Sequence, residues 1–597
     1  MRLSDYIVKF ISKKNVSHIF EVCGGAITHL LDSIYEKKEI TAVSMHHEQA
    51  AAFAAEGYSR VSGRVGVALA TSGPGATNLV TGIASAFFDS TATLFITGQV
   101  NTYEFKFNKP VRQAGFQETD IVNIVKPIVK EAHLITEPGK IGYYMERSFS
   151  VARSGRPGPV LLDIPMNVQC CDVPLSKLTP NIIRNKDIKP QVNLQTIRRI
   201  IDLLFSTRRP VILVGGGVGI ANARNQLWAL LEKTSIPVVS SLMGLDSCPY
   251  NLANFCGMIG TYGNRYANLI VANADLVLAL GTRLDSRQTG TVPSTFARGA
   301  KLVHVDIDPC EINSRIKADI GVVSDVKDFL LALNKKLTGY DRLRIKPWLD
   351  KTLEYKQKYP SWKKPKSKDI EPNFLMHVLS KFLPADSIIC LDVGQHQMWA
   401  GQSLELKKGQ LLITQGGMAS MGSSLPMAIG AAFAHPGRKI IVITGDGGFQ
   451  LNMQELQTVR HHNLPIKVIL LNNQGYGMIR QFQKQYFNSR FQSTVKGYSQ
   501  PDFQKVVSAY GIHSARIREV SQIEQGLKRV LRNKNPQFLE IMLGKSNLVF
   551  PKLAVGRPLE EQDPLLSEKE LRDNMLIATL PGKYNKRIGM QNKIKDI

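Results

Sequence analysis

Two polar segments of the chain carry groups that could hold a metal ion and a phosphate. Gly445-Asp446-Gly447-Gly448 supplies one carboxylate among three glycines, and Asn472-Asn473 supplies amide oxygens 26 and 27 positions after that Asp. Carboxylate and amide oxygens suit a hard cation that also binds phosphate oxygens. The glycines would let a diphosphate approach the backbone and the start of the next helix. The two segments therefore predict a cation that bridges the protein to a diphosphate.

The flanking residues place these two segments at one edge of a sheet. Lys439–Ile443 and Ile466–Leu471 are short, apolar and rich in β-branched residues, as buried parallel strands are. Gln450–Arg460 fits a connecting helix, which makes the whole a βαβ unit. Because open α/β sheets bind ligands at the carboxyl ends of their strands, we expect both polar segments to meet there.

A second constellation lies near the other end of the chain. Thr41–Gln49 passes from an extended segment into an Ala-rich helix, which we expect to end near Gly57–Arg60. Glu48, at the start of this helix, is explained on its own as a favourable charge at a helix N-terminus. Val67–Asn78 repeats the order of strand, glycine turn and helix, and Leu94–Gln99 is a third strand that ends on a polar tip.

Composition excludes several classes of function. Hydrophobic residues make up 43% of the 597 residues, which permits large cores, and no apolar run approaches the ~20 residues of a membrane span. The first residues show no signal-peptide core, so we expect a cytoplasmic protein. The net charge of +26 is spread along the chain without a nucleic-acid-binding motif. Neither nucleic acid nor membrane is therefore expected as a partner.

The seven cysteines form no CxxC pair, and their odd number gives no disulfide framework. We expect small, buried thiols in a reducing compartment. The neighbouring His46 and His47 lack the i, i+4 spacing of a zinc helix, which favours a role in packing or orientation.

Three α/β blocks follow one another along the chain, separated by polar or Lys-rich connectors at about 172–192 and 341–368. Each block repeats short apolar strands, glycine turns and helical segments. We therefore predict an α/β protein with three doubly wound parallel-sheet domains. The predicted boundaries are 1–170, 190–340 and 369–547 for the three domains and 548–597 for a C-terminal lid or tail.

Together these motifs resemble the thiamine diphosphate enzymes. Over nearly its full length the chain is similar to the catalytic subunits of the acetohydroxyacid (acetolactate) synthase family. The resemblance implies that the first domain binds the pyrimidine of the cofactor, the middle one is of an FAD-binding type and the third binds the diphosphate. The matching segments are Glu21–Ala26, Thr71–Asn78, Thr97–Val100, Gly155–Pro159, Val393–Trp399 and Gly477–Gln481.

The resemblance also assigns roles at the cofactor. Asp446, Asn473 and the backbone carbonyl of Gly475 would coordinate Mg²⁺. Glu48 of one subunit would bind the pyrimidine of a cofactor held by another subunit, so a homodimer is the smallest working unit. Met421 would wedge under the cofactor and bend it. The further cofactor-binding candidates are Gly24, Gly25, Ser72, Gly73, Gly394, Gln395, His396, Ala419, Gly445, Gly447, Gly448, Tyr476, Gly477 and Met478.

For the reaction, the family implies decarboxylation of pyruvate and transfer of the acetyl unit to a second 2-oxoacid, as in branched-chain amino acid biosynthesis. Gln99, Gln113 and Arg287 join Glu48 as catalytic candidates. Arg287 would hold the carboxylate of the acceptor through a bidentate pair. The higher oligomer, dimer or tetramer, and a separate regulatory subunit are left open.

The middle domain of this family often binds FAD without using its redox chemistry. In this chain the glycine turn misses the G-x-G-x-x-G spacing, because Ile220 occupies the last position. An ordinary strand-to-helix turn therefore stays as an alternative to an FAD site. The candidate FAD contacts are Gly215, Gly216, Gly217, Gly281, Arg283, Asp306, Ile307 and Asp325.

Several segments depart from the family pattern. Met166 stands where the family has Lys, Phe482 where it has the Trp that shapes the acceptor pocket, and Gly257–Gly260 where it has a Met-His pair. Tyr103–Arg112 looks like an insertion. The ending Gly556–Pro564 looks more like relatives that transfer an acetyl unit to nucleotide-linked keto-sugars. That acceptor is the alternative function, and a catalytically silent homologue is another, which the intact polar motifs oppose.

Overall fold

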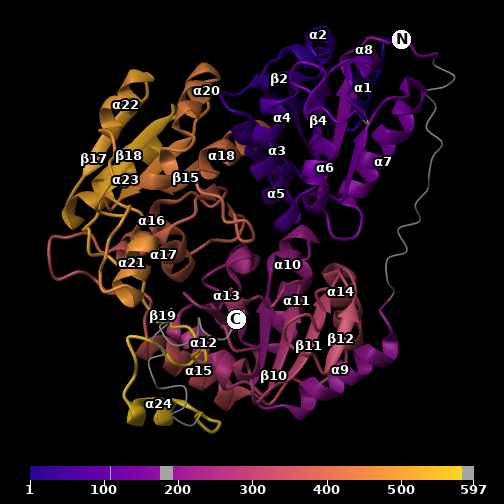
Figure 1. The fold of residues 1–597 in the computed structure, drawn as a ribbon. Coiled ribbons are helices and arrows are strands. Elements are labelled where there is room, and N and C mark those ends of the chain that lie inside the picture. Colours follow the sequence, from indigo (N-terminus) through magenta and orange to yellow (C-terminus); the bar gives the residue numbers. More distant parts are fainter. Residues whose placement is uncertain (108, 175–191, 581–597) are drawn as a thin grey trace.

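Three six-stranded parallel sheets, each flanked by helices, organise the computed structural model, which describes residues 1–107, 109–174 and 192–580 (Figure 1). The predicted α/β class with three parallel-sheet domains is confirmed. Most of the predicted connector at 172–192 and the last 17 residues lie outside the described residues. In the sequence colouring, the first domain is indigo to purple, the middle one magenta and the third orange.

The first sheet has the strand order β2-β1-β3-β4-β6-β5. Its central strands β3, β4 and β6 are buried along their whole length, as parallel strands covered on both faces are. The strands are β1 (His18–Glu21), β2 (Thr41–Ser44), β3 (Gly66–Ala70), β4 (Thr93–Gln99), β5 (Glu131–Leu134) and β6 (Pro159–Pro165). The helices include α1 (Leu3–Lys13), α2 (Thr28–Tyr35), α3 (Glu48–Ser62), α4 (Pro74–Asn78), α5 (Val80–Phe88), α6 (Ile121–Val125), α7 (Ile141–Arg153) and α8 (Met166–Gln169).

The middle sheet has the order β12-β11-β10-β7-β8-β9. Its strands are β7 (Pro210–Val214), β8 (Val238–Ser240), β9 (Phe255–Met258), β10 (Leu276–Leu280), β11 (Lys301–Asp306) and β12 (Ile320–Val323). The helices include α9 (Leu194–Ser206), α10 (Gly216–Ile220), α11 (Arg224–Thr234), α12 (Arg265–Ala272), α13 (Ser286–Thr289) and α14 (Val326–Lys336).

The third sheet, β14-β13-β15-β16-β18-β17, repeats the strand order of the first. Its strands are β13 (Ile388–Leu391), β14 (Leu411–Thr414), β15 (Ile440–Gly445), β16 (Lys467–Asn472), β17 (His513–Ile517) and β18 (Gln537–Met542). The helices include α16 (Pro372–Phe382), α17 (Gln395–Ser403), α18 (Ser424–Ala434), α19 (Asp446–Phe449), α20 (Leu456–His461), α21 (Gly477–Tyr486), α22 (Phe503–Ala509) and α23 (Ile523–Arg532).

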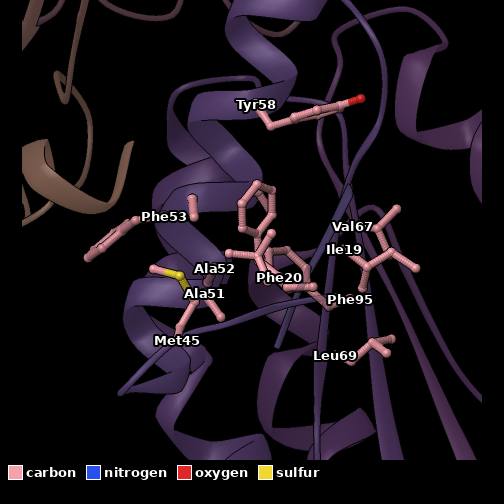
Figure 2. Packing of buried hydrophobic residues seen from close by; sticks show 14 of the residues in the cluster. Ile19, Phe20, Met45, Ala51, Ala52, Phe53, Tyr58, Val67, Leu69 and Phe95 are labelled. Carbon is pink, nitrogen blue, oxygen red and sulfur yellow. The ribbon is translucent and has the colours of Figure 1, made fainter. Parts of the chain in front are cut away.

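Helix α3 joins the first domain to the third. Tyr58 on α3 packs beside Phe20 of the first sheet, with ring centres 6.1 Å apart, whereas Phe53 lies on the other side of the helix (Figure 2). The alanines of α3 are fully buried. A Cβ on Gly57 would lie 2.7 Å from the Cα of Met427 in α18, so only glycine lets the two helices come this close. The helix runs to Ser62, past the predicted end, because its apolar face stays buried against α18.

The predicted βαβ unit is present, but its helix is broken. Where Gln450–Arg460 was expected to be one helix, the chain forms a 3-10 turn at Met453–Glu455 and then α20, and the single turn α19 precedes them. The side chain of Asn452 donates to the carbonyl of Gly422 at 2.9 Å and to Gln49. Asn452, at the break in the helix, therefore links the βαβ unit to the segments that carry Gly422 and Gln49.

The segments expected as a connector and as a C-terminal lid or tail both contain regular structure. The connector at 341–368 contains α15 (Lys346–Lys358), whose Trp348 is buried and donates to the carbonyl of Pro210 at 3.1 Å. In the predicted tail, 548–580 packs against the middle domain through Leu553, Leu559 and Met575. It forms the two-stranded sheet of β19 (Lys552–Leu553) and β20 (Gln562–Asp563), and helix α24 (Glu568–Asn574).

All seven cysteines are free thiols, as predicted, but they are not all buried. Cys248, Cys256 and Cys390 are buried, Cys171 is half-buried, and Cys23, Cys170 and Cys310 are exposed. Within 1–107, 109–174 and 192–580, no helix is both long and apolar enough to cross a bilayer.

Candidate active site

Three oxygen atoms converge at the carboxyl ends of β15 and β16. The side-chain oxygen of Asn473 lies 2.8 Å from the carbonyl oxygen of Gly475 and 3.3 Å from Oδ1 of Asp446. None of the three can donate a hydrogen bond. Turning the amide over would instead place its oxygen 2.7 Å from Oε1 of Gln395. Facing acceptor oxygens repel unless a cation lies among them, and Mg²⁺ prefers such oxygen ligands.

The other carboxylate oxygen of Asp446 is held by the protein. Oδ2 accepts hydrogen bonds from the backbone N–H of Gly475 at 2.9 Å and from the hydroxyl of Tyr498 at 2.5 Å. Burial raises the pKa of Asp446, although both hydrogen bonds act in the opposite direction. Oδ1 therefore stays directed at the other two oxygens. Tyr498 belongs to no motif, so its role could not be predicted from the sequence.

Gln395 and Gly477 pack beside these oxygens and align one of them. Asn473 Nδ2 donates to Gln395 Oε1 at 2.7 Å, which orients the amide oxygen of Asn473 toward Gly475. A Cβ on Gly477 would collide with Gln395 Oε1, so a larger residue there would displace the amide. The glycine is therefore part of how Asn473 is aligned.

The imidazole of His396 lies against the glycines of two adjacent strand ends. A Cβ on Gly394 would stand 2.6 Å from the ring, and one on Gly445 would stand 3.0 Å from it. Burial lowers the pKa of His396 to about 3, so the ring is neutral at neutral pH. Its buried Nε2 has no hydrogen-bond partner in the described structure. Buried polar atoms are rarely left so, and this one marks a place for a ligand group.

The other diphosphate candidates share this edge of the third sheet. Because β14, β13, β15 and β16 are neighbours, the turns that follow them lie side by side. Ala419 has a positive φ of 56°, and Met421 is half-buried in the turn after β14. The candidates that the topology brings to this edge are Gly394, Gln395, His396, Ala419, Met421, Gly445, Gly447, Gly448, Tyr476, Gly477 and Met478.

The first sheet presents a second set at its own carboxyl edge. Glu48 follows β2, while Gly24, Gly25, Ser72 and Gly73 follow the adjacent β1 and β3. The carboxylate of Glu48 is 9% exposed and accepts a hydrogen bond from the side chain of Asn78 at 2.9 Å. His47, not Glu48, caps the helix, since its ring nitrogen accepts the backbone N–H of Gln49. Glu48 is therefore the acidic residue of the first helical turn rather than the N-cap.

The amide of Gln99 is fully engaged within the protein. Its Nε2 donates to the carboxylate of Asp163 at 2.8 Å and to the carbonyl of Thr119 at 2.7 Å, and its Oε1 accepts the N–H of Val100. The structure thus places Gln99 beneath the site edge, as a support for the chain that follows it. A direct role in catalysis stays a prediction, and the amide would have to leave these partners to perform it.

The buried carboxyl of Asp163, which accepts a hydrogen bond from Gln99, should make the stability of the fold depend on pH. Burial raises its pKa to about 7, against hydrogen bonds from Thr97 and Gln99 that lower it. A carboxyl with a raised pKa stabilises the fold below its ordinary pKa, and this contribution is lost as pH rises through the folded value. Between pH 5 and 8 the wild type should lose up to about 3 kcal/mol of stability through this carboxyl, and we expect Asp163→Asn to flatten the corresponding fall of the melting temperature. Thermal scans at pH 5 and pH 8 measure this fall for the wild type, for Asp163→Asn and for the exposed control Asp573→Asn. If the melting temperature of Asp163→Asn falls as much as that of the wild type, the prediction is wrong.

Gln113 lies on an exposed loop of the first domain. Its amide donates to the carbonyl of Glu118 at 3.0 Å. The carboxylate of Glu118 accepts backbone N–H groups from Lys106, Ala114 and Gly115, which folds the predicted insertion around it. The loop exposes Tyr103, Phe107, Val111 and Phe116. Within one chain, Gln113 therefore stands apart from the third-domain residues.

A cavity of about 370 Å³ opens between the three domains. The middle domain lines it with the ends of β7, β10, β11 and β12, which are adjacent in the sheet. Its other walls include Asp89 and Arg156 from the first domain and Gly394, Ala419 and Met478 from the third. The predicted FAD contacts that line it are Gly216, Gly217, Gly281, Arg283, Asp306, Ile307 and Asp325. Gly215 lies directly behind, with its N–H donating to the carbonyl of Leu280.

Two cavity residues were not assigned from the sequence. Arg156 pairs with Glu311 at 2.5 Å and with Asp308 at 3.3 Å, across the boundary to the middle domain. Asp89 accepts the backbone N–H groups of Gly416 and Gly417, and so holds the turn that carries Ala419 and Met421. Arg156 lies in the Gly155–Pro159 motif, but which partner it meets depends on domain packing.

Arg287 also lines the cavity, with its guanidinium carbon 5.8 Å from the centre of the Tyr262 ring. Glu48, Gln99 and Gln113 are not among the residues that line it. No group of three or more His, Cys, Asp or Glu that could hold a metal occurs in the described parts of the chain. The oxygen cluster at Asp446 has one carboxylate only, and it depends on amide and carbonyl oxygens.

Comparison with family models gives three matches in chain order. Residues 1–124 match the N-terminal TPP binding domain of thiamine pyrophosphate enzymes, 197–333 match the central domain and 392–541 match the C-terminal TPP binding domain. Each match falls on one of the three sheets. The oxygen cluster lies in the C-terminal match and Glu48 in the N-terminal one.

Individual relatives align along almost the whole chain. The acetolactate synthase large subunit of Lactococcus lactis is 36% identical over 96% of this chain and 98% of its own length. The large subunit of acetolactate synthase isozyme 2 of Escherichia coli is 36% identical over 95% of this chain and all of its own. A chloroplastic acetolactate synthase of Zea mays is 36% identical over 93% of this chain and 87% of its own.

Proposed function

Because the chain belongs to the thiamine pyrophosphate enzymes and is acetolactate synthase-like, we propose that it decarboxylates pyruvate and transfers the acetyl unit to a 2-oxoacid in a Mg²⁺-dependent reaction. The observation that carries the proposal is the convergence of the oxygens of Asp446, Asn473 and Gly475 beside the buried Nε2 of His396. These groups fit a cation and a diphosphate together, as the cofactor requires.

The residues of this chain would hold the cofactor at its two ends. Asp446, Asn473 and Gly475 would bind Mg²⁺, and His396 would face the diphosphate. Glu48, held by Asn78, would bind the pyrimidine and place its proton. When bound, the cofactor supplies the electron sink that pyruvate lacks for loss of carbon dioxide. The protein contributes position, proton placement and exclusion of water.

The two ends belong to different subunits in this proposal. Glu48 does not line the cavity that the third domain shares, and its carboxylate is bound by Asn78 of its own domain. A second copy would supply the missing half of each site, so we propose a homodimer at least. Relatives in Lactococcus lactis and Escherichia coli are named large subunits, which supports a smaller partner.

A 2-oxoacid is the proposed acceptor. Arg287 faces the cavity without a carboxylate partner in the described structure, and its fork geometry suits a carboxylate. The relatives reported above are acetolactate synthases, which supports a 2-oxoacid over a keto-sugar. The decisive experiment incubates the protein with pyruvate, Mg²⁺ and thiamine diphosphate and identifies the products. Acetolactate would support the proposal, and carbon dioxide release without it would move the assignment to another acceptor.

We expect weak selection between acceptors. Met166 and Phe482 replace a cation and an indole of the family pattern. Phe482 packs against Tyr486, with ring centres 4.7 Å apart, whereas Met166 lies in the first domain. Such changes alter discrimination by only about 1–3 kcal/mol. Competition between pyruvate and 2-oxobutyrate should therefore give nearly equal products, and a strong 2-oxobutyrate preference would contradict this account.

The cavity between the domains would hold FAD. Arg283 lines it, and in the described part of the chain its one ion pair is a distant one, with Asp285 at 3.6 Å, so its guanidinium is available to a phosphate. A charge-assisted hydrogen bond contributes about 1.5–3 kcal/mol. We expect Arg283→Ala to weaken FAD binding about tenfold, measured by fluorescence quenching, with exposed Arg344→Ala as control. Equal affinity in both variants would favour the ordinary strand-to-helix turn.

A further inference from the structure

A lysine of the C-terminal segment is buried among aromatic rings. Lys552 in β19 is 5% exposed. Its ammonium lies 5.9 Å from the ring centre of Tyr262, 5.8 Å from that of Phe482 and 5.6 Å from that of Tyr486. It donates one hydrogen bond, to the side chain of Gln485. Tyr262, which lines the cavity, thus connects this lysine to the cavity wall.

Arg287 lies over the ring of Tyr262, and both residues line the cavity. Its guanidinium carbon is 5.8 Å from the ring centre of Tyr262, so the two cations are about 12 Å apart at most. Across the described residues, neither cation has a carboxylate within ion-pair distance. The half-buried Arg298 is paired with Glu560, whereas the buried Lys467 and Arg265 donate to backbone carbonyls. The molecule therefore leaves two positive charges unneutralised at one end of its cavity.

Because Lys552 is buried without a paired anion among the described residues, the pKa of its ammonium group is lowered. Burial, with a smaller effect of Arg287, lowers the pKa of the ammonium to about 8, although Asp563 on the paired strand acts in the opposite direction. The hydroxyls of Tyr262 and Tyr486 have raised pKa values and stay neutral. The facing groups thus offer aromatic rings, an amide and one carboxylate beyond ion-pair distance. An anion bound at Arg287 would favour the charged form of the lysine.

Resting on the proposed function, we propose that Lys552 is a specificity-determining residue, which together with Arg287 selects an anionic acceptor over a neutral one. Lys552 would act through the electrostatic potential at the cavity wall rather than by touching the acceptor. Two unit charges at about 10–12 Å in a protein interior interact strongly enough to change affinity by about three- to tenfold after screening. This is the size of effect that the variants should show.

The test compares two acceptors with pyruvate as donor: 2-oxobutyrate, which is anionic, and propanal, which is neutral. The readout is the ratio of their kcat/KM values. Lys552→Met should lower the anionic-over-neutral ratio about three- to tenfold, and Lys552→Arg should keep it. Lys408 is the matched control, because its ammonium lies 4.9 Å from the Trp228 ring on the exposed surface. Lys408→Met should leave the ratio unchanged.

A pH profile separates this role from a structural one. In the wild type the ratio should fall as pH rises through about 8, since Lys552 then loses its proton. In Lys552→Arg it should stay level, and this comparison carries the test if the Met variant fails to fold. An unchanged ratio in Lys552→Met, or the same pH dependence in Lys552→Arg, would overturn the inference. Absence of donor turnover in the wild type would instead overturn the proposed function on which it rests.

Discussion

Asp446→Ala should abolish binding of thiamine diphosphate with Mg²⁺ while the fold is retained. The side chain supplies the single carboxylate of the oxygen cluster, so the cation would lose its only charged protein ligand. Loss of a partner outside the ligand shell already costs about 10–100-fold in metal affinity, and loss of the ligand itself should cost more. Calorimetric titration of the variant with both components should show no saturable binding.

The apo protein provides an internal check on this variant. Because burial raises the pKa of Asp446, its removal takes an unfavourable buried charge out of the apo protein. The melting temperature without ligand should therefore stay level or rise, while the increase caused by cofactor and Mg²⁺ should disappear. Exposed Asp573→Ala should keep that increase. Undiminished cofactor affinity in Asp446→Ala would show that the oxygen cluster is not the metal site.

Much of the sheet architecture could be predicted because buried parallel strands have a strong local pattern. Lys439–Ile443 and Ile466–Leu471 were expected as neighbouring strands, and β15 pairs with β16 in parallel. Apolar runs bounded by Gly, Asp or Asn leave few alternatives. Strand ends in a parallel sheet share one edge, so the clustering of Asp446 and Asn473 also followed from local sequence.

The packing of distant segments against each other could not be predicted from local sequence patterns. Trp348 and Tyr355 mark a helix only because they dock on the middle domain, where Tyr355 donates to the carbonyl of Asn574. The Lys-rich residues around them indicate a solvated connector when read locally. Likewise, Asn452 breaks a helical pattern because its amide is bonded to Gly422 and Gln49, which are distant in sequence.

The residues of the candidate site also fall into these two groups: those predictable from local sequence and those that depend on packing. Residues on one sheet edge were grouped correctly by motif, as in the oxygen cluster and the cavity contacts of the middle domain. Tyr498, Asp89 and Lys552 reach the site from loops or from the C-terminal segment, and their types alone are ambiguous. The role of Glu48 depends on the proposed homodimer, because within one chain its carboxylate accepts a hydrogen bond from Asn78 of its own domain.

Glu48→Gln should separate proton placement from helix stability. The substitution keeps the size of the side chain and one hydrogen bond, but it removes the acid. A general acid–base group contributes ~10²–10⁴-fold, so kcat should fall by that order while the cofactor still binds. Exposed Glu568→Gln, in the first turn of α24, is the control for a charge at a helix N-terminus. If Glu48→Gln and Glu568→Gln both keep wild-type kcat, Glu48 serves only the helix.

Mixing the two inactive variants tests whether the site is shared between subunits. A dimer of one Glu48→Gln chain and one Asp446→Ala chain would contain one site with both residues intact and one with neither. Random association of equal amounts makes half of the dimers mixed, so activity should recover to roughly a quarter of wild type for a two-fold symmetric pair. The mixture must be unfolded and refolded together, with each variant treated alone as control. Recovery would require Glu48 of one subunit to meet the metal site of the other, whereas no recovery would place both residues in one chain.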